Sequence, residues 1–538
     1  MSSTHRAHSK LDLDPGVVAA CRQAARQIAD HVSERTAGRT TVSVERSVTR
    51  LLGVDGADSL EAPLPNVVVD HVHDHGGLGQ GIAHWLGNAM IQTGKSPQQI
   101  AEAVSAGELD VCALEQAEDG AIHARVSEEC SARLTEISKR FEERQAMRDR
   151  LGRSTAPLRY VLTATGDVYE DVVHAKAVAQ AGGDIVAVIR STAQSLLDYV
   201  PYGPTTEGYG GTFATQANFR IMREAMDEWS ESHGRYIRLS SFCSGLCMSE
   251  IAAMGAWEGF DNMVNDALYG ILYRDINIVR GLIDQRVSRM INGYFGVVIN
   301  TGEDNYLRTA DAVEAAPSVT ASQFINHELA RDSGVPDAQI GLGDAFEIDN
   351  PVTNGFLLEL AQAQLTRELF PDCPVKYMPP TKHMDGNLFR THATDTMFNL
   401  VTIATHQGIQ TIGVPSEGIF TPHIHDRVLG LQNVDYVFNA ARDLGEEIEF
   451  KRGGIIQTRA QQVLADAHKL LEGIAQKGLF KAIEDATFGD VSRREDEGRG
   501  IEGIVTTEEG YFNPVVELMS NGPAATGPAP LQDEASYA

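Results

Sequence analysis

The segment Asp184–Gly203, DIVAVIRSTAQSLLDYVPYG, carries the pattern that decides the fold. An apolar run typical of a β-strand ends on Arg190, and the hydroxyl side chains of Ser191, Thr192 and Ser195 follow it. In a parallel sheet, ligands bind at the C-terminal ends of the strands. A guanidinium fork, short hydroxyl donors and a helix start together suit a phosphate group. The segment therefore predicts a bound phosphate, although an Arg190 paired with a surface carboxylate fits the pattern equally well.

Short β-rich runs alternate with helical stretches from residue 157 onward. The eight predicted strands are Arg159–Ala164, Ile185–Arg190, Tyr236–Ser241, Leu268–Tyr273, Gly296–Asn300, Gln339–Leu342, Val375–Met378 and Gln410–Val414. Eight such units over roughly 260 residues fit a TIM barrel better than an open doubly wound sheet. No predicted strand is followed by the GxGxxG fingerprint, which weakens a dinucleotide-binding interpretation.

The predicted fold class is therefore α/β, a TIM (β/α)8 barrel with additional N- and C-terminal helical regions. Residues 1–156 show apolar positions at helical spacing and form a mainly helical N-terminal region. Residues 157–427 form the barrel. Residues 428–538 form a helical accessory region that ends in a tail of low hydrophobicity.

Composition excludes several classes of partner. The chain has 538 residues, 42% of them hydrophobic, and a formal net charge of -29. Such an acidic chain lacks the basic face that nucleic acids or anionic membranes require. No run of 18 apolar residues is present, and the N-terminal sequence shows no secretory signal. The six cysteines form no disulfide framework, so we predict a cytoplasmic protein.

Polar residues follow nearly every predicted strand. Those that could carry chemistry are Arg190, Ser195, Ser244, Tyr269, Arg274, Glu303, Asp304, Lys376 and Glu417. Arginines and serines suit an anion, an aromatic ring suits a flat heterocycle, and carboxylates with a lysine suit an amino acid. Pyridoxal phosphate with an amino-acid substrate meets all three needs. Such an enzyme requires a lysine for the resting Schiff base, which could be Lys376, Lys382 or a lysine of another chain.

Two histidine patterns lie outside the predicted barrel. In DHVHDHGGLGQ, His71, His73 and His75 would share one face of an extended segment, but their position outside the barrel favours no metal site. Asp466 and His468 begin a DxHxxG cobalamin motif. The surrounding run is helical and has leucine at the glycine position, so we do not assign that motif here.

Several long segments share one family resemblance. They are TVSVERSVTRLLGVDG, VIRSTAQSLLDYVPYGPTTEGYGGT, SFCSGLCMSEIAAMGA, NDALYGILYRDIN, INTGEDNYLRTADA and KYMPPTKHMDGN. From about residue 12 to residue 519, the chain resembles the alpha subunits of D-lysine 5,6-aminomutase. The resemblance implies a TIM-barrel subunit of an isomerase that uses pyridoxal 5'-phosphate and adenosylcobalamin.

The resemblance also implies a partner and residue roles. A cobalamin-binding beta subunit would supply the Schiff-base lysine and the cobalt-ligand histidine in an alpha2beta2 assembly. By resemblance, Arg190, Ser195 and Ser244 would hold the phosphate, and Tyr269 would stack on the pyridine ring. The residues around the ring substituents and the substrate's polar ends would be Arg274, Asp304, Lys376 and Glu417.

The implied reaction is a radical 1,2-amino shift that moves the terminal amine of D-lysine or L-β-lysine from C6 to C5. An ornithine 4,5-aminomutase would do the same chemistry on a shorter substrate, but its pyridoxal-bearing chain carries the cobalamin domain. A stand-alone pyridoxal barrel, such as a racemase, would need its own Schiff-base lysine. A non-catalytic binding subunit would not need so many charged strand ends.

Overall fold

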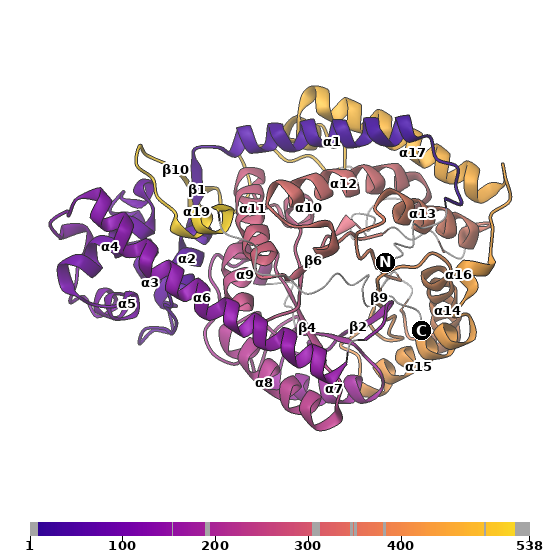
Figure 1. The fold of residues 1–538 in the computed structure, drawn as a ribbon, viewed down its shortest axis with the longest axis horizontal. Coiled ribbons are helices and arrows are strands. Elements are labelled where there is room, and N and C mark those ends of the chain that lie inside the picture. Colours follow the sequence, from indigo (N-terminus) through magenta and orange to yellow (C-terminus); the bar gives the residue numbers. More distant parts are fainter. Residues whose placement is uncertain are drawn as a thin grey trace.

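A ring of parallel strands forms the centre of the molecule (Figure 1). The structure is a computed structural model that describes residues 9–152, 154–188, 194–303, 312–344, 348, 352–379, 384–488 and 491–521. The eight strands of the ring are β2 (Leu158–Leu162), β3 (Ile185–Ala187), β4 (Arg238–Phe242), β5 (Asn262–Val264), β6 (Val298–Asn300), β7 (Ile340–Gly341), β8 (Lys376–Tyr377) and β9 (Ile409–Thr411). The predicted TIM barrel is confirmed.

The strands follow one another around the ring in chain order. Parallel pairing runs from β2 to β7, and β9 pairs with both β8 and β2. A parallel bridge between Gly343 and Lys376 closes the remaining gap, where Lys376 N–H donates to the Leu342 carbonyl at 2.8 Å. Among the described residues the eight strands thus form a nearly closed barrel, in which this single bridge joins the segments of β7 and β8.

One predicted strand is wrong. Residues Leu268–Tyr273 belong to helix α10 (Ala267–Arg274), and the fourth strand is the three-residue segment Asn262–Val264. Asp266 begins the helix by accepting hydrogen bonds from the backbone N–H groups of Leu268 and Tyr269. A short apolar run fits a strand and a buried helix equally well. Here the N-cap hydrogen bonds of Asp266 stabilise the helix.

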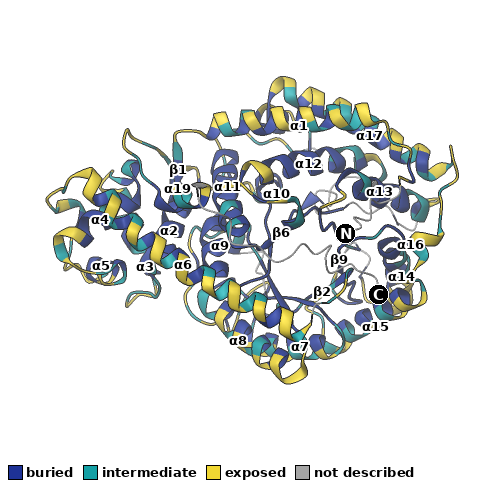
Figure 2. Cartoon of the chain, in the orientation of Figure 1, coloured by how far each residue is buried: buried dark blue, intermediate teal, exposed yellow. Residues whose placement is uncertain are grey.

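Helices surround the barrel and bury their inner faces against it (Figure 2). The barrel helices are α7 (Val168–Gln180), α8 (Gln216–His233), α9 (Met248–Trp257), α11 (Ile278–Tyr294), α12 (Ala312–Asp332), α13 (Gly355–Leu369), α14 (Leu388–Ala404) and α15 (Ile424–Ala440). Helix α15 completes the ring and crosses residue 427, where we placed the end of the barrel. Within the described residues, no helix combines the length and apolar character needed to cross a bilayer.

The N-terminal helices extend to one side of the barrel (Figure 1). They are α2 (Val42–Leu51), α3 (Leu64–Asp74), α4 (Ile82–Thr93), α5 (Pro97–Ser105) and α6 (Asp119–Leu151). Helix α1 (Pro15–Thr36) instead packs on α12 together with α17 (Ile455–Lys477). The N-terminal and C-terminal regions also meet where β1 (Arg39–Thr41) pairs with β10 (Ile504–Thr506).

The barrel interior combines an apolar layer with polar side chains. Leu158, Tyr160, Ile185, Ala187, Val298 and Ile409 form the apolar cluster. Alternation along the strands directs Ser240 to the same face, where its hydroxyl lies 3.1 Å from that of Tyr160. Tyr377 points outward and packs against Phe398, so its neighbour Lys376 faces the interior. The interior is thus a packed core that becomes polar toward the strand ends.

Candidate functional site

The loops after the strands emerge at one end of the barrel, because the strands are parallel. The described residues among those we predicted for the site are Ser195, Ser244, Tyr269, Arg274, Glu303, Lys376 and Glu417. Arg190, Asp304 and Lys382 lie outside the described residues. The predictions for these three positions therefore remain sequence predictions.

Ser195 and Ser244 lie on segments that pack against each other. Ser195 belongs to the short helix η3 (Gln194–Leu196), and the Leu246 N–H donates to its carbonyl at 3.3 Å. A Cβ atom added to Gly245 would lie 2.5 Å from the Ser195 Cα, and Gly245 has a φ of 92°. Only glycine permits this close approach. The structure thus brings the loops after β3 and β4 together and leaves both serines partly buried.

Tyr269 and Arg274 form one unit on helix α10. The Arg274 guanidinium carbon lies 5.3 Å from the centre of the Tyr269 ring, and Arg274 Nη2 donates to the Tyr269 hydroxyl at 3.2 Å. A cation over an aromatic face attracts the ring electrostatically, and the hydrogen bond fixes its orientation. Both side chains are partly exposed.

A segment from the C-terminal region holds α10 in place. Arg493 donates from Nε to the Ile271 carbonyl at 3.0 Å and from Nη2 to the Leu272 carbonyl at 2.7 Å. These carbonyls belong to the last turn of the helix, where no intrahelical donor is available. The Arg499 N–H adds a bond of 2.7 Å to the carbonyl of Asp275. Residues more than 200 positions away thus orient the helix that presents Tyr269.

Two buried carboxyl groups have strongly raised pKa values. Burial, with the charge of Asp266 nearby, raises the pKa of Glu303 to about 8. Its Oε2 accepts hydrogen bonds from the Thr301 hydroxyl at 2.5 Å and from the Gly343 N–H at 3.0 Å. Burial also raises the pKa of Asp395, on α14, to about 8, and the nearby charge of Glu417 adds to the shift. Both groups hold a proton near neutral pH, which is typical of functional sites.

Asp395 and Asp266 were not among the predicted site residues. Asp395 lies in the middle of a helix with no motif around it, so no local signal marks it. Asp266 precedes an apolar run in the pattern of an N-cap, which could have revealed both the helix and its cap. Their importance follows from proximity in space to Glu417 and Glu303.

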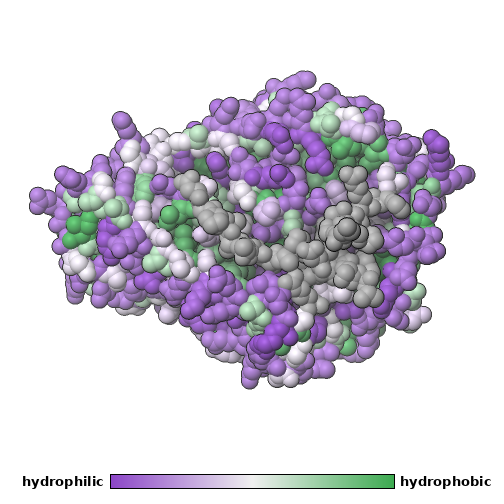
Figure 3. Space-filling view, in the orientation of Figure 1, coloured by the Kyte–Doolittle hydropathy of each residue, from purple (hydrophilic) through white to green (hydrophobic). Residues whose placement is uncertain are grey.

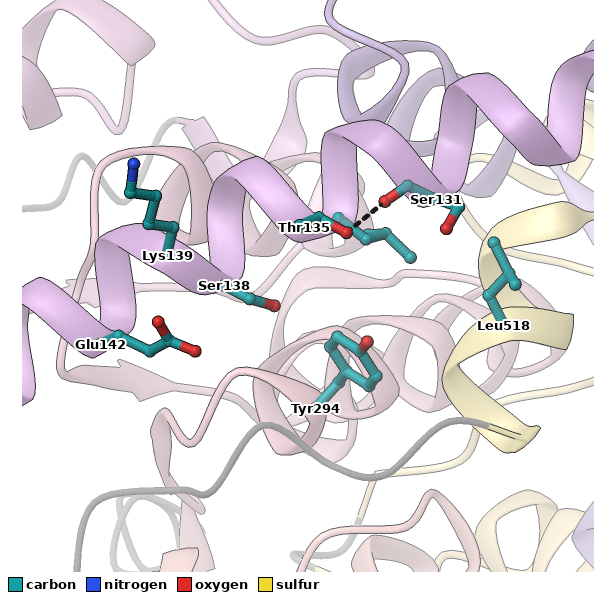
Figure 4. A pocket seen from close by; sticks show the side chains of 8 residues that line it. Ser131, Thr135, Ser138, Lys139, Glu142, Tyr294 and Leu518 are labelled. Atoms are coloured by element: carbon teal, nitrogen blue, oxygen red, sulfur yellow. Dashed lines mark hydrogen bonds between the residues drawn. The ribbon is translucent and has the colours of Figure 1, made fainter.

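A separate groove lies outside the barrel (Figure 4). It has a volume of about 390 Å³ and is lined by Ser131, Leu134, Thr135, Ser138, Lys139, Glu142, Tyr294 and Leu518. The groove contains none of the predicted site residues. The face of the molecule seen in this orientation is largely hydrophilic, with scattered apolar patches (Figure 3). We therefore place the candidate site at the strand ends.

The fold is a (βα)8 barrel, and the candidate site at its strand ends combines hydroxyls, an arginine–tyrosine unit and two buried carboxyls with raised pKa values. The family model for the D-lysine 5,6-aminomutase TIM-barrel domain of the alpha subunit matches residues 11–518. The chain belongs to this family of lysine 5,6-aminomutase alpha subunits, which are aminomutases.

Three curated relatives illustrate the similarity. The chain is 52% identical over 513 residues to the lysine 5,6-aminomutase alpha subunit of Acetoanaerobium sticklandii, covering 95% of this chain and 99% of that protein. It is 52% identical over 514 residues to the Fusobacterium nucleatum subunit, with the same coverage. The D-ornithine 4,5-aminomutase subunit beta of A. sticklandii is 27% identical over 375 residues, which span 67% of this chain and 50% of that protein.

Proposed function

We propose that this chain is the pyridoxal-phosphate-binding alpha subunit of an adenosylcobalamin-dependent lysine 5,6-aminomutase. The enzyme would move the terminal amine of D-lysine or L-β-lysine from C6 to C5. The observation that carries the proposal is the near full-length match to subunits of that name at 52% identity. The match to the ornithine enzyme is much weaker, which favours lysine as the substrate.

The residues at the strand ends fit a pyridoxal phosphate. The close packing at Gly245 gathers two serine-bearing loops, which suits a small anion such as the phosphate. Tyr269, held by Arg274, offers a ring face for the pyridine. When bound, the pyridine would delocalise the unpaired electron during migration of the amine, and adenosylcobalamin would supply the initiating radical.

The chain's own residues would position these groups and exclude water. We assign Arg190, Ser195 and Ser244 to the phosphate and Tyr269 to the ring. Arg274, Asp304, Lys376 and Glu417 would surround the ring substituents and the polar ends of the substrate. A proton on Glu303 removes its repulsion of Asp266, and thereby stabilises the cap of the helix that carries Tyr269.

A beta subunit would complete the site. Exposed aromatic side chains near the strand ends support such a docking surface: Tyr199, Tyr202, Tyr209, Phe389 and Phe420. We propose an alpha2beta2 assembly in which the partner supplies the lysine that attaches the cofactor and the histidine that binds cobalt. The six free cysteines suit a reducing cytoplasm.

The decisive experiment is a reconstitution. The chain is purified with and without a co-expressed cobalamin-binding partner, and D-lysine is added with both cofactors. We expect 2,5-diaminohexanoate only when the partner and both cofactors are present. Omission of each component in turn serves as the control. Product formation by the chain without a partner would contradict the two-subunit proposal, and turnover of ornithine but not lysine would contradict the substrate.

A further inference from the structure

His71 and His75 lie on one face of the C-terminal end of α3, and a third potential metal ligand faces them. The side chain of Cys112, in η2 (Val111–Ala113), approaches both histidines. The potential ligand atoms of these three residues all lie within 4.8 Å of one another. The sequence did not reveal this cluster, because α3 is helical rather than extended and Cys112 lies far along the chain.

The helix places two of the three histidines on one face and the third on another. His71 and His75 are four residues apart and therefore lie on the same face, with their ring centres 4.5 Å apart and the ring planes tilted by 43°. His73 points elsewhere, and its nearest ionic neighbour is Asp74 at 4.0 Å. The pair and the cysteine thus form a distinct cluster, and His73 offers a matched control within the same helix.

Hydrogen bonds orient two of the three ligands. His75 Nδ1 lies 2.7 Å from the His71 carbonyl, which can only accept, so Nδ1 carries the proton and Nε2 keeps its lone pair. Asp110 Oδ1 lies 3.0 Å from His71 Nε2 and also accepts from the Cys112 N–H at 2.9 Å. Bonds from the second ring nitrogen to a backbone carbonyl or a carboxylate accompany metal-binding histidines in general.

We propose that His71, His75 and Cys112 bind a divalent ion of the zinc class, and that Asp110 is a positioning residue for this site. Imidazole and thiolate together favour zinc over magnesium or calcium, which prefer oxygen ligands. Tetrahedral bonds of about 2.0–2.3 Å require ligand atoms about 3.3–3.6 Å apart. His71 and Cys112 are partly exposed and His75 is exposed, so small side-chain rotations can close the remaining distance.

The site would act in the N-terminal helical region rather than at the strand ends. Figure 1 shows α3 to the side of the barrel. Cys112 precedes α6. Arg148 of α6 forms an ion pair of 2.7 Å with Asp261, the residue before β5 of the barrel. A bound ion would fasten the loop before α6 to the end of α3. The inference is thus independent of the proposed aminomutase site.

Cobalt(II) is the probe for the first test. The full chain, freed of any polyhistidine tag, metal and oxidised thiol, is titrated with Co²⁺ and followed by absorption. We expect saturation at one equivalent, with intense tetrahedral bands and a thiolate-to-cobalt charge-transfer band that Zn²⁺ bleaches. Weak octahedral bands alone, or saturation well below one equivalent, would overturn the proposal.

Four variants assign the ligands. Cys112→Ser should abolish the charge-transfer band, and His75→Gln should weaken binding strongly, whereas His73→Gln should match the wild type. Asp110→Asn should weaken binding about 10–100-fold, as expected for a group that orients a ligand. Because the His75 side chain is exposed, its replacement should leave metal-free melting unchanged. A retained charge-transfer band in Cys112→Ser, or equal losses in the two histidine variants, would refute the assignment.

Thiol labelling gives an independent measurement. The other five cysteines are buried, and Cys112 alone of the six is partly exposed. Iodoacetamide should therefore label Cys112 first, and one equivalent of Zn²⁺ should slow this labelling in the wild type and in His73→Gln but not in His75→Gln. Unchanged labelling in the presence of Zn²⁺ would contradict the site.

Discussion

Replacement of Tyr269 tests the geometry of the cofactor site most directly. Tyr269→Phe removes the hydroxyl that accepts the 3.2 Å hydrogen bond from Arg274 but keeps the ring. Hydrogen bonds to charged groups contribute about 1.5–3 kcal/mol, and partial exposure reduces this to about 1 kcal/mol. That bond lies within the protein and forms without the cofactor, so it affects binding only through the orientation of the ring. We therefore expect Tyr269→Phe to keep most of the affinity for pyridoxal phosphate, with a loss of at most about 5-fold.

Tyr269→Ala removes the ring as well. Loss of aromatic stacking on the cofactor adds about 0.5–1.5 kcal/mol to the about 1 kcal/mol of the hydroxyl. The total of about 1.5–2.5 kcal/mol corresponds to a loss of affinity of about 10–70-fold. Pyridoxal phosphate is titrated against each variant in complex with the partner subunit, followed by absorption. Tyr273→Phe serves as the control, because it keeps the backbone carbonyl that Arg274 also contacts.

A double-mutant cycle identifies the hydrogen bond itself. Arg274→Met removes the donor, so its effect and that of Tyr269→Phe should overlap rather than add. Additive losses would show that the bond does not contribute to cofactor binding. Equal losses of cofactor affinity in Tyr269→Phe and Tyr269→Ala would show that the hydroxyl, and not the ring, contributes to binding. That result would refute stacking. Wild-type affinity for pyridoxal phosphate in Tyr269→Ala would show that Tyr269 only packs within the protein and does not bind the cofactor.

Four further predictions follow from the same site. Borohydride treatment of the isolated chain with pyridoxal phosphate should give no stoichiometric adduct, whereas specific labelling of Lys376 would favour a stand-alone enzyme. Arg190→Ala should weaken cofactor binding more than Arg190→Lys, since a guanidinium grips phosphate with two parallel bonds; equal affinity in the wild type and the alanine variant would remove Arg190 from the site. The raised pKa of Glu303 means that its stabilising effect is complete below pH 4.5 and is lost as pH rises through about 8. Melting curves of Glu303→Gln should therefore fall less over that range than those of the wild type, and parallel curves would contradict the raised pKa. Arg493→Ala should weaken cofactor binding by releasing the end of α10, while Arg494→Ala, which loses only the exposed pairs with Asp496 and Glu497, should not.

The sequence determined the barrel because its signal is local and repeated. Runs such as Ile185–Arg190 and Gln410–Val414 are rich in apolar residues, and each overlaps a strand of the structure, β3 and β9 respectively. The same regularity placed Ser195, Ser244 and Glu417 after their strands. Family resemblance carried the function, since residue patterns alone left several pyridoxal enzymes open.

Only the tertiary structure decided the features that depend on contacts between distant segments. The strand Asn262–Val264 is three residues long and has no local signal, because its neighbours in the barrel supply the pairing. The raised pKa of Asp395 arises from burial and from a carboxylate on another loop. Likewise, Cys112 meets His71 and His75 only because the chain folds back against α3. Hydrogen bonding, burial and charge act over a few ångströms in space, and sequence spacing does not encode that proximity.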